Sequence, residues 1–390
     1  MAGHQSPRER LESEERQRLS DVATLSTDKR LAHRVYSHDP DDYRTEFHRD
    51  YTRIIHSRAF RRLRHKTQVF ISPKNDHLCT RMEHSLHVAS VATSIARALQ
   101  LNEDLVRAIA IGHDLGHAPF GHIGQSVLDG LAKANGGKGF WHELQSLRCV
   151  DFLESPYEDH NGLNLTFAVR DGIACHYGEA FEQELRADRE KPEDSLTGIT
   201  RGEAKPATLE GCVVRWADKV AYLGRDLEDA VELGMVKRAE LPKAVRDVLG
   251  DTNKKIISSL VRELVRHGTG KDCLSVGSGV HEALNAFYKF NMNAIYKSQQ
   301  ATRHREQISR AMESLFALLL AELNKGEGNI GKMASDPHSC LKVFAQFLNG
   351  DIKDWQREKP AQVVIDFIAG MTDSFFVEAF TELFLPRPTV

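Results

Sequence analysis

The sequence has no apolar run that approaches the length of a membrane span, and its first twenty residues contain no apolar segment of the kind found in signal peptides. Its six cysteines are scattered without a CxxC pair, which argues against a zinc ribbon and a disulfide framework. Neither sign of charge dominates: 52 Lys and Arg oppose 55 Asp and Glu, so overall charge does not favour nucleic acid or an anionic membrane. We therefore expect a cytoplasmic protein with reduced thiols and no membrane partner.

Segments that alternate apolar and polar residues are also scarce, and no internal repeat is visible. Apolar residues recur instead at the three- and four-residue spacing of helices. An apolar fraction of 41% with 27% charged residues is typical of a globular protein with a sizeable core. The predicted fold class is all-α, with at most a small hairpin.

Capping residues help to delimit the predicted helices. Asn102 and Thr208 are placed to cap helices at their N-termini, and Gly234 to end one. The polar residues 1–40 are expected to form a frayed helix or an extended arm, and 186–206 a loop. The expected helices cover residues 81–100, 103–112, 122–134, 141–154, 165–178 and 208–233, with a helical pattern also over 41–66 and further helices over 240–390.

Residues 326–333 (GEGNIGKM) match the GxGxxG pattern and nearly match a phosphate-binding loop. Met333 stands where such a loop has a hydroxyl that binds Mg²⁺, and the preceding residues 314–323 have a helical pattern where a strand is required. No nucleotide-binding role is therefore predicted for this segment.

Histidines concentrate in one part of the chain. His84 lies in the predicted helix 81–100, the pair His113-Asp114 follows the next helix, and His117 and His122 come within the following eight residues. Such a density of metal ligands and proton carriers suits a metal-assisted hydrolase.

A divalent ion needs several convergent ligands, and one more carboxylate would complete a set with His84, His113 and Asp114. The best candidate is Asp218, because it lies on a mostly apolar helix where a buried carboxylate needs a cation or a paired donor. Residues 218, 222 and 226 share one face of this helix by their spacing. Each residue alone is more often structural, but the combination predicts a metal site.

Five segments together resemble the HD superfamily of metal-dependent phosphohydrolases, and within it the bacterial deoxyguanosine triphosphate triphosphohydrolase-like proteins. They are IHSRAFRRLRHKTQVF (55–70), TRMEHSL (80–86), HDLGHAPFGH (113–122), HELQS (142–146) and RWADKVAY (215–222). The resemblance spans about residues 30 to 235. It implies an HD-domain helical core over 41–235, a polar arm over 1–40, and additional C-terminal helices over 236–390 packed on the core.

The resemblance also implies an activity, which is hydrolysis of a dNTP at the α-phosphate to a deoxynucleoside and intact triphosphate. The metal ligands would be His84, His113, Asp114 and Asp218, holding Mn²⁺ or Mg²⁺, while mixed N/O ligands also admit Fe²⁺, Co²⁺ or Zn²⁺. His122 would transfer the proton, His117 and His142 would lie against the phosphates, and Arg81 and Lys219 would neutralise charge. Gln68 and Asp226 would bind the sugar 3′-hydroxyl, and Tyr222 would exclude a 2′-hydroxyl.

One position departs from the family pattern. The residue three after the equivalent of His122 is usually an acid that pairs with this histidine, and here it is Gln125. An amide oxygen can accept the imidazole N–H, but it cannot stabilise an imidazolium by charge. Glu143, which follows His142, is an alternative acid.

Two other functions stay open. The chain could act on another nucleotide as an HD phosphohydrolase, although Gln68, Tyr222 and Asp226 argue for a deoxysugar. It could also be a weakly active nucleotide sensor or single-strand nucleic-acid binder that uses the basic residues of 58–66, which Gln125 favours and the metal set opposes. The same basic block fits a solvated or subunit-facing surface equally well. The resemblance implies an even-numbered homo-oligomer, a hexamer or tetramer.

Overall fold

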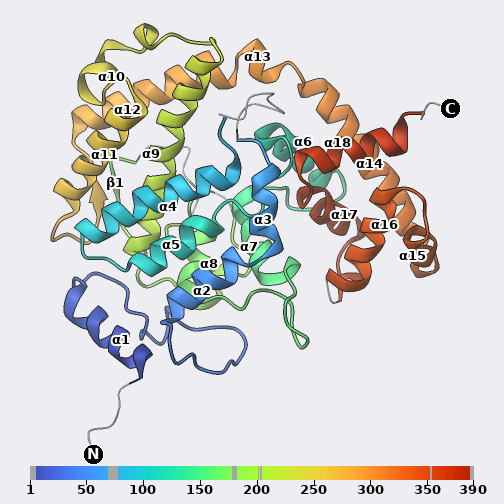
Figure 1. Ribbon diagram of the computed structural model, residues 1–390, viewed down its shortest axis with the longest axis horizontal. Coiled ribbons are helices and arrows are strands. Elements are labelled where there is room, and N and C mark those ends of the chain that lie inside the picture. Colours follow the sequence, from blue (N-terminus) through green and yellow to red (C-terminus); the bar gives the residue numbers. More distant parts are fainter. Residues whose placement is uncertain are drawn as a thin grey trace, which may run out of the picture. The chain divides into compact units, whose positions relative to one another are not determined.

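The computed structural model describes residues 6–68, 78–177, 182–200, 202, 204–351 and 354–386. Its helices confirm the all-α prediction (Figure 1). The α-helices are α1 (Pro7–Arg18), α2 (Glu46–Ile55), α3 (Arg58–Arg62), α4 (Arg81–Ala98), α5 (Glu103–Gly112), α6 (Gly121–Ala134), α7 (His142–Arg148), α8 (Phe167–Ala174), α9 (Leu209–Glu232), α10 (Lys243–Val248), α11 (Asn253–Gly268), α12 (Ser278–Asn291), α13 (Gln299–Thr302), α14 (Arg305–Asn324), α15 (Glu327–Ala334), α16 (Ser339–Gln346), α17 (Pro360–Ala369) and α18 (Asp373–Phe384).

Shorter elements complete the description. Turns of 3₁₀-helix lie at Leu63–His65, Glu193–Leu196, Arg238–Glu240 and Trp355–Arg357, and π-helical turns at Cys149–Leu153, Met292–Tyr296 and Phe347–Asp351. Two strands, β1 (Glu184–Leu185) and β2 (Leu274–Ser275), pair antiparallel across a long stretch of chain, so they do not form the small hairpin that the sequence allowed. Among the described residues, no helix is both long enough and apolar enough to cross a bilayer.

The chain folds into two compact units, each assembled from separate segments. Unit 1 contains the residues up to His56, Glu83–Asp114 and Asn164–Ser298, and unit 2 contains Ser57–Met82, Leu115–Leu163 and the residues from Gln299 onward. The division predicted in chain order, at residues 40 and 235, is a different partition, because both units draw on segments that are distant in sequence.

Helix ends in unit 1 agree with the predicted caps. The Asn102 side chain accepts hydrogen bonds from the backbone N–H groups of Asp104 and Leu105, and Thr208 accepts one from Gly211. Gly234 follows α9 with a φ of +67°, a conformation that glycine adopts without the strain of a side chain. In this unit α9 packs against α5, α8, α11 and α12, which holds the helix of Asp218 against the helix that His113 follows.

Several predicted helices are shorter in the structure, among them 165–178, which is α8 over Phe167–Ala174. The pattern over 41–66 breaks at Ser57, whose extended backbone and side-chain oxygen cap α3 instead of continuing α2. The pattern over 141–154 ends as an α-helix at Arg148 and continues as a π-helical turn. Residues 327–334 of the GxGxxG segment form α15 directly after helix α14, so no strand precedes the glycines.

Polar side chains between residues 6 and 40 make buried contacts within unit 1. Glu15 of α1 is buried, and its carboxylate accepts hydrogen bonds from Ser26 and Asn102. Thr24 donates to both carboxylate oxygens of Glu210 on α9 at 2.8 Å. The sequence predicted a frayed helix or an extended arm because residues 1–40 are polar. In the structure, the polar groups of Glu15 and Thr24 are buried and paired with specific partners.

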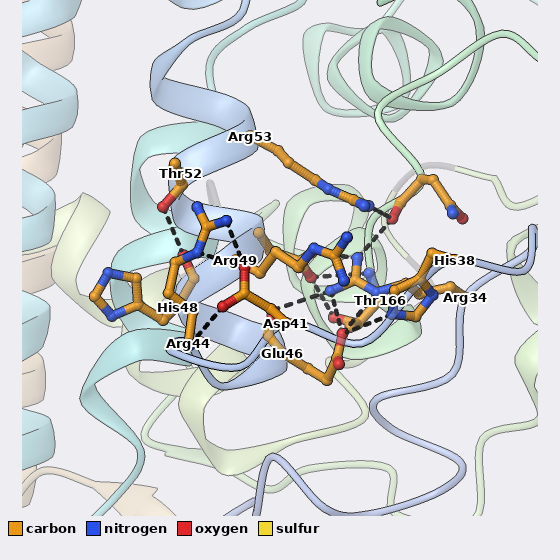
Figure 2. A network of polar contacts seen from close by, with 12 residues as sticks. Arg34, His38, Asp41, Arg44, Glu46, His48, Arg49, Thr52, Arg53 and Thr166 are labelled. Atoms are coloured by element: carbon orange, nitrogen blue, oxygen red, sulfur yellow. Dashed lines mark hydrogen bonds and ion pairs between the residues drawn. The ribbon is translucent and has the colours of Figure 1, made fainter. Parts of the chain in front are cut away.

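A buried ionic network joins this segment to α2 and α8 (Figure 2). The Arg34 guanidinium donates to Glu46 at 2.6 and 2.8 Å and to Asp50 at 2.5 Å, and its side chain is only 1% exposed. Asp50 also accepts hydrogen bonds from the backbone and hydroxyl of Thr166, the residue before α8. The network therefore holds the start of α8 against α2, and both helices pack on α5.

Replacing Arg34 by Ala is expected to lower the free energy of unfolding by about 3–5 kcal/mol, because it leaves the carboxylate of Asp50 buried without its cation and that of Glu46 with Arg8 as its remaining arginine partner. Arg44→Ala is the matched control, since its partner Asp41 is a local contact of a half-exposed arginine, and exposed pairs contribute at most about 1 kcal/mol. Urea unfolding of both variants tests this. Similar small losses in the two would contradict the assigned role of Arg34.

In unit 2 the C-terminal helices form a common core with α6 (Figure 1). Helices α14 and α17 both contact α6. Residues that share this core include Leu128, Met312, Leu315, Phe344 and Val364. The C-terminal region therefore supports the helix that carries His122 and Gln125.

Candidate active site

Three predicted metal ligands converge in unit 1. His84 comes from α4, His113 follows α5 directly, and Asp218 lies in the middle of α9. The His84 Nε2 atom is 2.9 Å from Asp218 Oδ1, and His113 Nε2 is 3.8 Å from the same oxygen. One ligand atom of each residue lies within 4.8 Å of the others, a spacing that allows all three to reach one ion. The structure thus brings together residues that are about 30 and 100 positions apart.

The protonation of this group favours metal binding. His113 Nδ1 lies 2.6 Å from the Ala110 carbonyl oxygen, so it donates its proton there and leaves Nε2 as the lone-pair nitrogen. Burial lowers the pKa of His113, which keeps the imidazole neutral as a ligand must be. For Asp218, burial alone would raise the pKa, but the hydrogen bond from His84 and the neighbouring histidines outweigh it and lower the pKa to about 2.

Asp114, the fourth predicted metal ligand, lies next to His113 in the chain. Its side chain is buried, and Asp114 Oδ1 lies 3.8 Å from His113 Nε2. Two imidazole nitrogens and two carboxylates form a donor set that suits several divalent ions without selecting strongly among them. The residues present therefore fit the implied metal, although they do not identify it.

His176 is a neighbour of this group that the sequence reasoning missed. It follows α8, is buried, and its ring centroid lies 5.0 Å from that of His113 in an edge-to-face arrangement. Its Nδ1 atom is 2.6 Å from the Ile173 carbonyl, the same contact to the third preceding residue that His113 makes. The sequence offered no signal for it, because residue 176 falls inside the helix predicted over 165–178 and only the end of α8 at Ala174 reveals the likeness to His113.

Further along α9, the structure places Lys219, Tyr222 and Asp226 on the same helix as Asp218. Burial lowers the pKa of Lys219 to about 7. Asp226 is buried, and its Oδ2 atom accepts a hydrogen bond from the Tyr296 hydroxyl at 2.5 Å. Tyr296 ends the π-helical turn after α12 and was not a predicted site residue, because nothing in the sequence links it to α9.

Unit 2 contains a second histidine group. The rings of His117 and His142 stack with centroids 4.5 Å apart, and His122 lies 5.4 Å from His117 and 6.2 Å from His142. Gly116 allows this arrangement, because a Cβ atom there would lie 2.2 Å from the backbone at Gln145 and Ser146 of α7. The structure therefore brings the three histidines together, and sequence spacing alone did not require this of His142.

The partner of Gln125 differs from the prediction. Gln125 Oε1 accepts hydrogen bonds from the ring Nδ1 of His142 at 2.8 Å and from its backbone N–H at 3.2 Å, so the amide holds His142 and not His122. Helix α6 places Gln125 one turn after His122, but α7 begins beside the amide and supplies two donors to it. Glu143 is buried, with Oε2 3.5 Å from His142 Nδ1, so the alternative acid also lies at His142.

Gln68 and Arg81 meet beside Gly121, the residue before His122, where a Cβ atom would lie 3.2 Å from the Gln68 carbonyl oxygen and 3.4 Å from the Arg81 guanidinium. The Arg81 guanidinium donates to the Gln68 carbonyl oxygen at 3.3 Å, and the Arg81 backbone N–H donates to the Lys66 carbonyl at 3.1 Å. Thr67 and Thr80 form an antiparallel bridge between the two segments. Of the basic block, Arg58, Arg61 and Arg64 are exposed, whereas Lys66 is completely buried.

Replacing Gln125 by Glu is expected to raise turnover by about 10-fold, less than the roughly 10²- to 10⁴-fold of full general acid–base assistance. A carboxylate at this position would stabilise the protonated imidazole of His142, which would then offer a positive charge to a phosphate. The measurement is the pH dependence of the rate. In this variant the active range should reach higher pH, while the metal content stays unchanged. An unchanged pH dependence would mean that residue 125 does not influence the protonation of His142 during turnover.

Comparison with known proteins agrees with this geometry. The profile of the HD domain matches residues 81–223, and that of the phosphohydrolase-associated domain matches residues 274–382. A protein of Caldanaerobacter subterraneus is 40% identical over 98% of this chain and 96% of its own length. Relatives from Desulfatibacillum aliphaticivorans and Clostridium tetani are 36% and 32% identical, and each alignment covers at least 97% of both chains.

These matches, together with the convergence of His84, His113 and Asp218, define an HD-domain phosphohydrolase. All three relatives carry the description "deoxyguanosinetriphosphate triphosphohydrolase-like protein". The chain belongs to this family, as the motifs in its sequence predicted.

Proposed function

We propose that the protein hydrolyses deoxynucleoside triphosphates such as dGTP, in the presence of Mn²⁺ or Mg²⁺, to a deoxynucleoside and intact triphosphate. The observation that carries the proposal is the convergence of His84, His113 and Asp218 on one possible ion position, on a chain whose relatives are described as similar to a dGTP triphosphohydrolase. A divalent ion held there would polarise a phosphoryl oxygen as a Lewis acid.

The chain's own residues divide the remaining work. His122 would protonate the 5′-oxygen as the bond to the α-phosphorus breaks, because an alkoxide is otherwise a poor leaving group. His117 and His142 would contact phosphate oxygens, supported by their stacked rings. Arg81 and Lys219 would neutralise the charge that builds on the triphosphate. Since burial lowers the pKa of Lys219 to about 7, a polyanion beside it would favour its protonated form.

The sugar would be recognised by Gln68, Tyr222 and Asp226. The contact between Asp226 and the Tyr296 hydroxyl supports this role for Asp226, because it fixes one carboxylate oxygen and orients the other. A site built to hydrogen-bond a hydroxyl discriminates strongly against a ligand that lacks it or cannot fit. The proposal therefore assigns dNTP selectivity to α9.

A direct test is to incubate the purified protein with each dNTP and each NTP, with Mn²⁺ or Mg²⁺, and to measure release of the nucleoside. Release of deoxynucleoside from one or more dNTPs is expected. Release from a nucleoside monophosphate or a cyclic nucleotide only would support an HD phosphohydrolase of another substrate class.

Replacing Tyr222 by Ala is expected to admit ribonucleotides, because it removes bulk near the 2′ position. The preference for dNTP over NTP should fall by about 10-fold or more, the scale of a lost packing contact in a specificity pocket. Comparison of kcat/KM for dGTP and GTP measures this, with Tyr288→Ala on α12 as a tyrosine control. An unchanged preference in the Tyr222 variant would place selectivity elsewhere.

A further inference from the structure

The loop that carries His117 and leads to His122 has a strained backbone. Phe120 adopts the left-handed conformation with φ of +60° and ψ of +25°, and Gly121 follows with φ of +59°. A glycine accepts this conformation readily, but a residue with a bulky side chain does so at a cost of order 1–3 kcal/mol and only where its surroundings hold it. These two residues set the direction in which α6 starts, and therefore where His122 points.

Asp373, the first residue of α18, holds this turn. Its Oδ1 atom accepts the backbone N–H of Phe120 at 3.0 Å. Its Oδ2 atom accepts the hydroxyl of Thr67 at 2.6 Å and the backbone N–H of Thr67 at 3.2 Å. The carboxylate is buried, and the ring of Phe376, one turn along α18, packs edge-to-face on that of Phe120 at 5.1 Å. One side chain thus ties the turn before His122 to the segment that carries Gln68.

Lys66 makes a second connection between the same three segments. Its Nζ atom donates to the backbone carbonyl of His117 and, at 2.7 Å, to that of Ala369 at the end of α17. The side chain is completely buried, and burial lowers the pKa of Lys66 to about 7. A neutral amine still has two N–H donors, one for each carbonyl, so the contacts do not require the charge.

We propose that Lys66 and Asp373 are positioning residues for His117 and His122, through which the C-terminal helices hold the histidine loop in its working geometry. The proposal rests on the proposed function, because the geometry matters only if these histidines act on a substrate. A buried lysine and a buried aspartate contribute little net stability to a fold, because removing each polar group from water costs free energy. Their bonds go to the loop backbone at His117, before the strained turn, and at Phe120, within it, which suits a positioning role.

The test compares Asp373→Asn and Lys66→Met with Glu154→Gln. Asn keeps one acceptor oxygen but turns an N–H group toward the donors of Thr67 or Phe120, and Met keeps the length of Lys without its donors. Glu154 is a matched control: it is a buried carboxylate of the same unit that accepts the backbone N–H groups of Arg58 and Ala59 at 3.0 and 2.7 Å, away from the histidine loop.

In both test variants, kcat for the best dNTP is expected to fall by about 10- to 100-fold, the effect of a catalytic group displaced by about 1 Å. KM and bound metal should change by less than about 3-fold. Hydrogen exchange of the peptides that contain Thr67 and Phe120, followed by mass spectrometry, should be at least about 10-fold faster at one of these two backbone N–H groups in Asp373→Asn than in Glu154→Gln, because the amide oxygen replaces only one of the two carboxylate acceptors.

A kcat within 2-fold of the unchanged protein in Asp373→Asn or Lys66→Met would overturn the proposal, as would an equal loss of kcat in Glu154→Gln. The exchange measurement separates this result from failure of the proposed function. If the unchanged protein hydrolyses no dNTP, the proposed function fails, while faster exchange at Thr67 or Phe120 in Asp373→Asn, and not in Glu154→Gln, still supports the anchoring of the loop. Unchanged exchange in that variant would refute the anchoring itself.

Discussion

Asp218→Ala is expected to lose its bound divalent metal and at least about 10³-fold in turnover, since a Lewis-acid ion supplies several kcal/mol of transition-state stabilisation. Asp218 is the residue that His84 and His113 share, with its Oδ1 atom 2.9 and 3.8 Å from their Nε2 atoms. Removing it leaves two imidazoles and only one carboxylate, that of Asp114, to complement a dication. His113→Ala should have the same effect, because its Nε2 atom is oriented for this site by the Ala110 carbonyl.

Asp229→Ala provides the control on the same helix. Asp229 is also a buried aspartate of α9, but its carboxylate pairs with Arg225 at 2.7 Å and belongs to no group of candidate metal ligands found among the described residues. Metal content per chain and kcat should be measured on the same preparations. Asp218→Ala or His113→Ala that retained one metal ion per chain would exclude the altered residue from the site, whatever happened to turnover.

His122→Ala is expected to lower turnover by about 10²- to 10⁴-fold, the range of general acid–base catalysis, with the metal retained. The 5′-oxygen of a deoxynucleoside leaves slowly unless it receives a proton, whereas a nitrophenolate needs none. The loss should therefore be much smaller with a nitrophenyl phosphodiester as substrate than with a dNTP. His65→Ala, a change of an exposed histidine in the same unit, is the control and should leave both rates unchanged.

An equal loss with the dNTP and the nitrophenyl substrate would mean that His122 does not donate the proton. In that case His117 is the next candidate, because its ring lies 5.4 Å from that of His122 and stacks on His142. Single-turnover measurements keep product release out of this comparison.

Local features of the fold were predictable from the sequence where their determinants are local. Asn102 and Thr208 cap α5 and α9 as expected, because a cap depends on the side chain and the three residues after it. The break at Ser57 was missed, since the apolar spacing continues through it and only the cap geometry reveals the interruption. The burial of Glu15 and Arg34 could not be predicted, because their partners come from other helices.

The candidate site was predictable to the extent that motifs mark it. His84, His113 and Asp218 were inferred from their residue types and helices, and the structure brings them together. The partner of Gln125 was wrongly assigned, because spacing along α6 favoured His122 while the start of α7 places His142 against the amide. Tyr296 and Asp373 were missed for the same reason: each meets its partner through tertiary packing of a C-terminal segment without motifs.

The proposed reaction cleaves a dNTP between the α-phosphorus and the 5′-oxygen. Phosphorus NMR of a reaction with dGTP and Mn²⁺ in ¹⁸O-labelled water tests it most directly. If water attacks the α-phosphorus, tripolyphosphate is expected as the only phosphorus product, with one labelled oxygen on a terminal phosphoryl group. The deoxyguanosine should be unlabelled. Formation of pyrophosphate with dGMP, or of orthophosphate with dGDP, would contradict it.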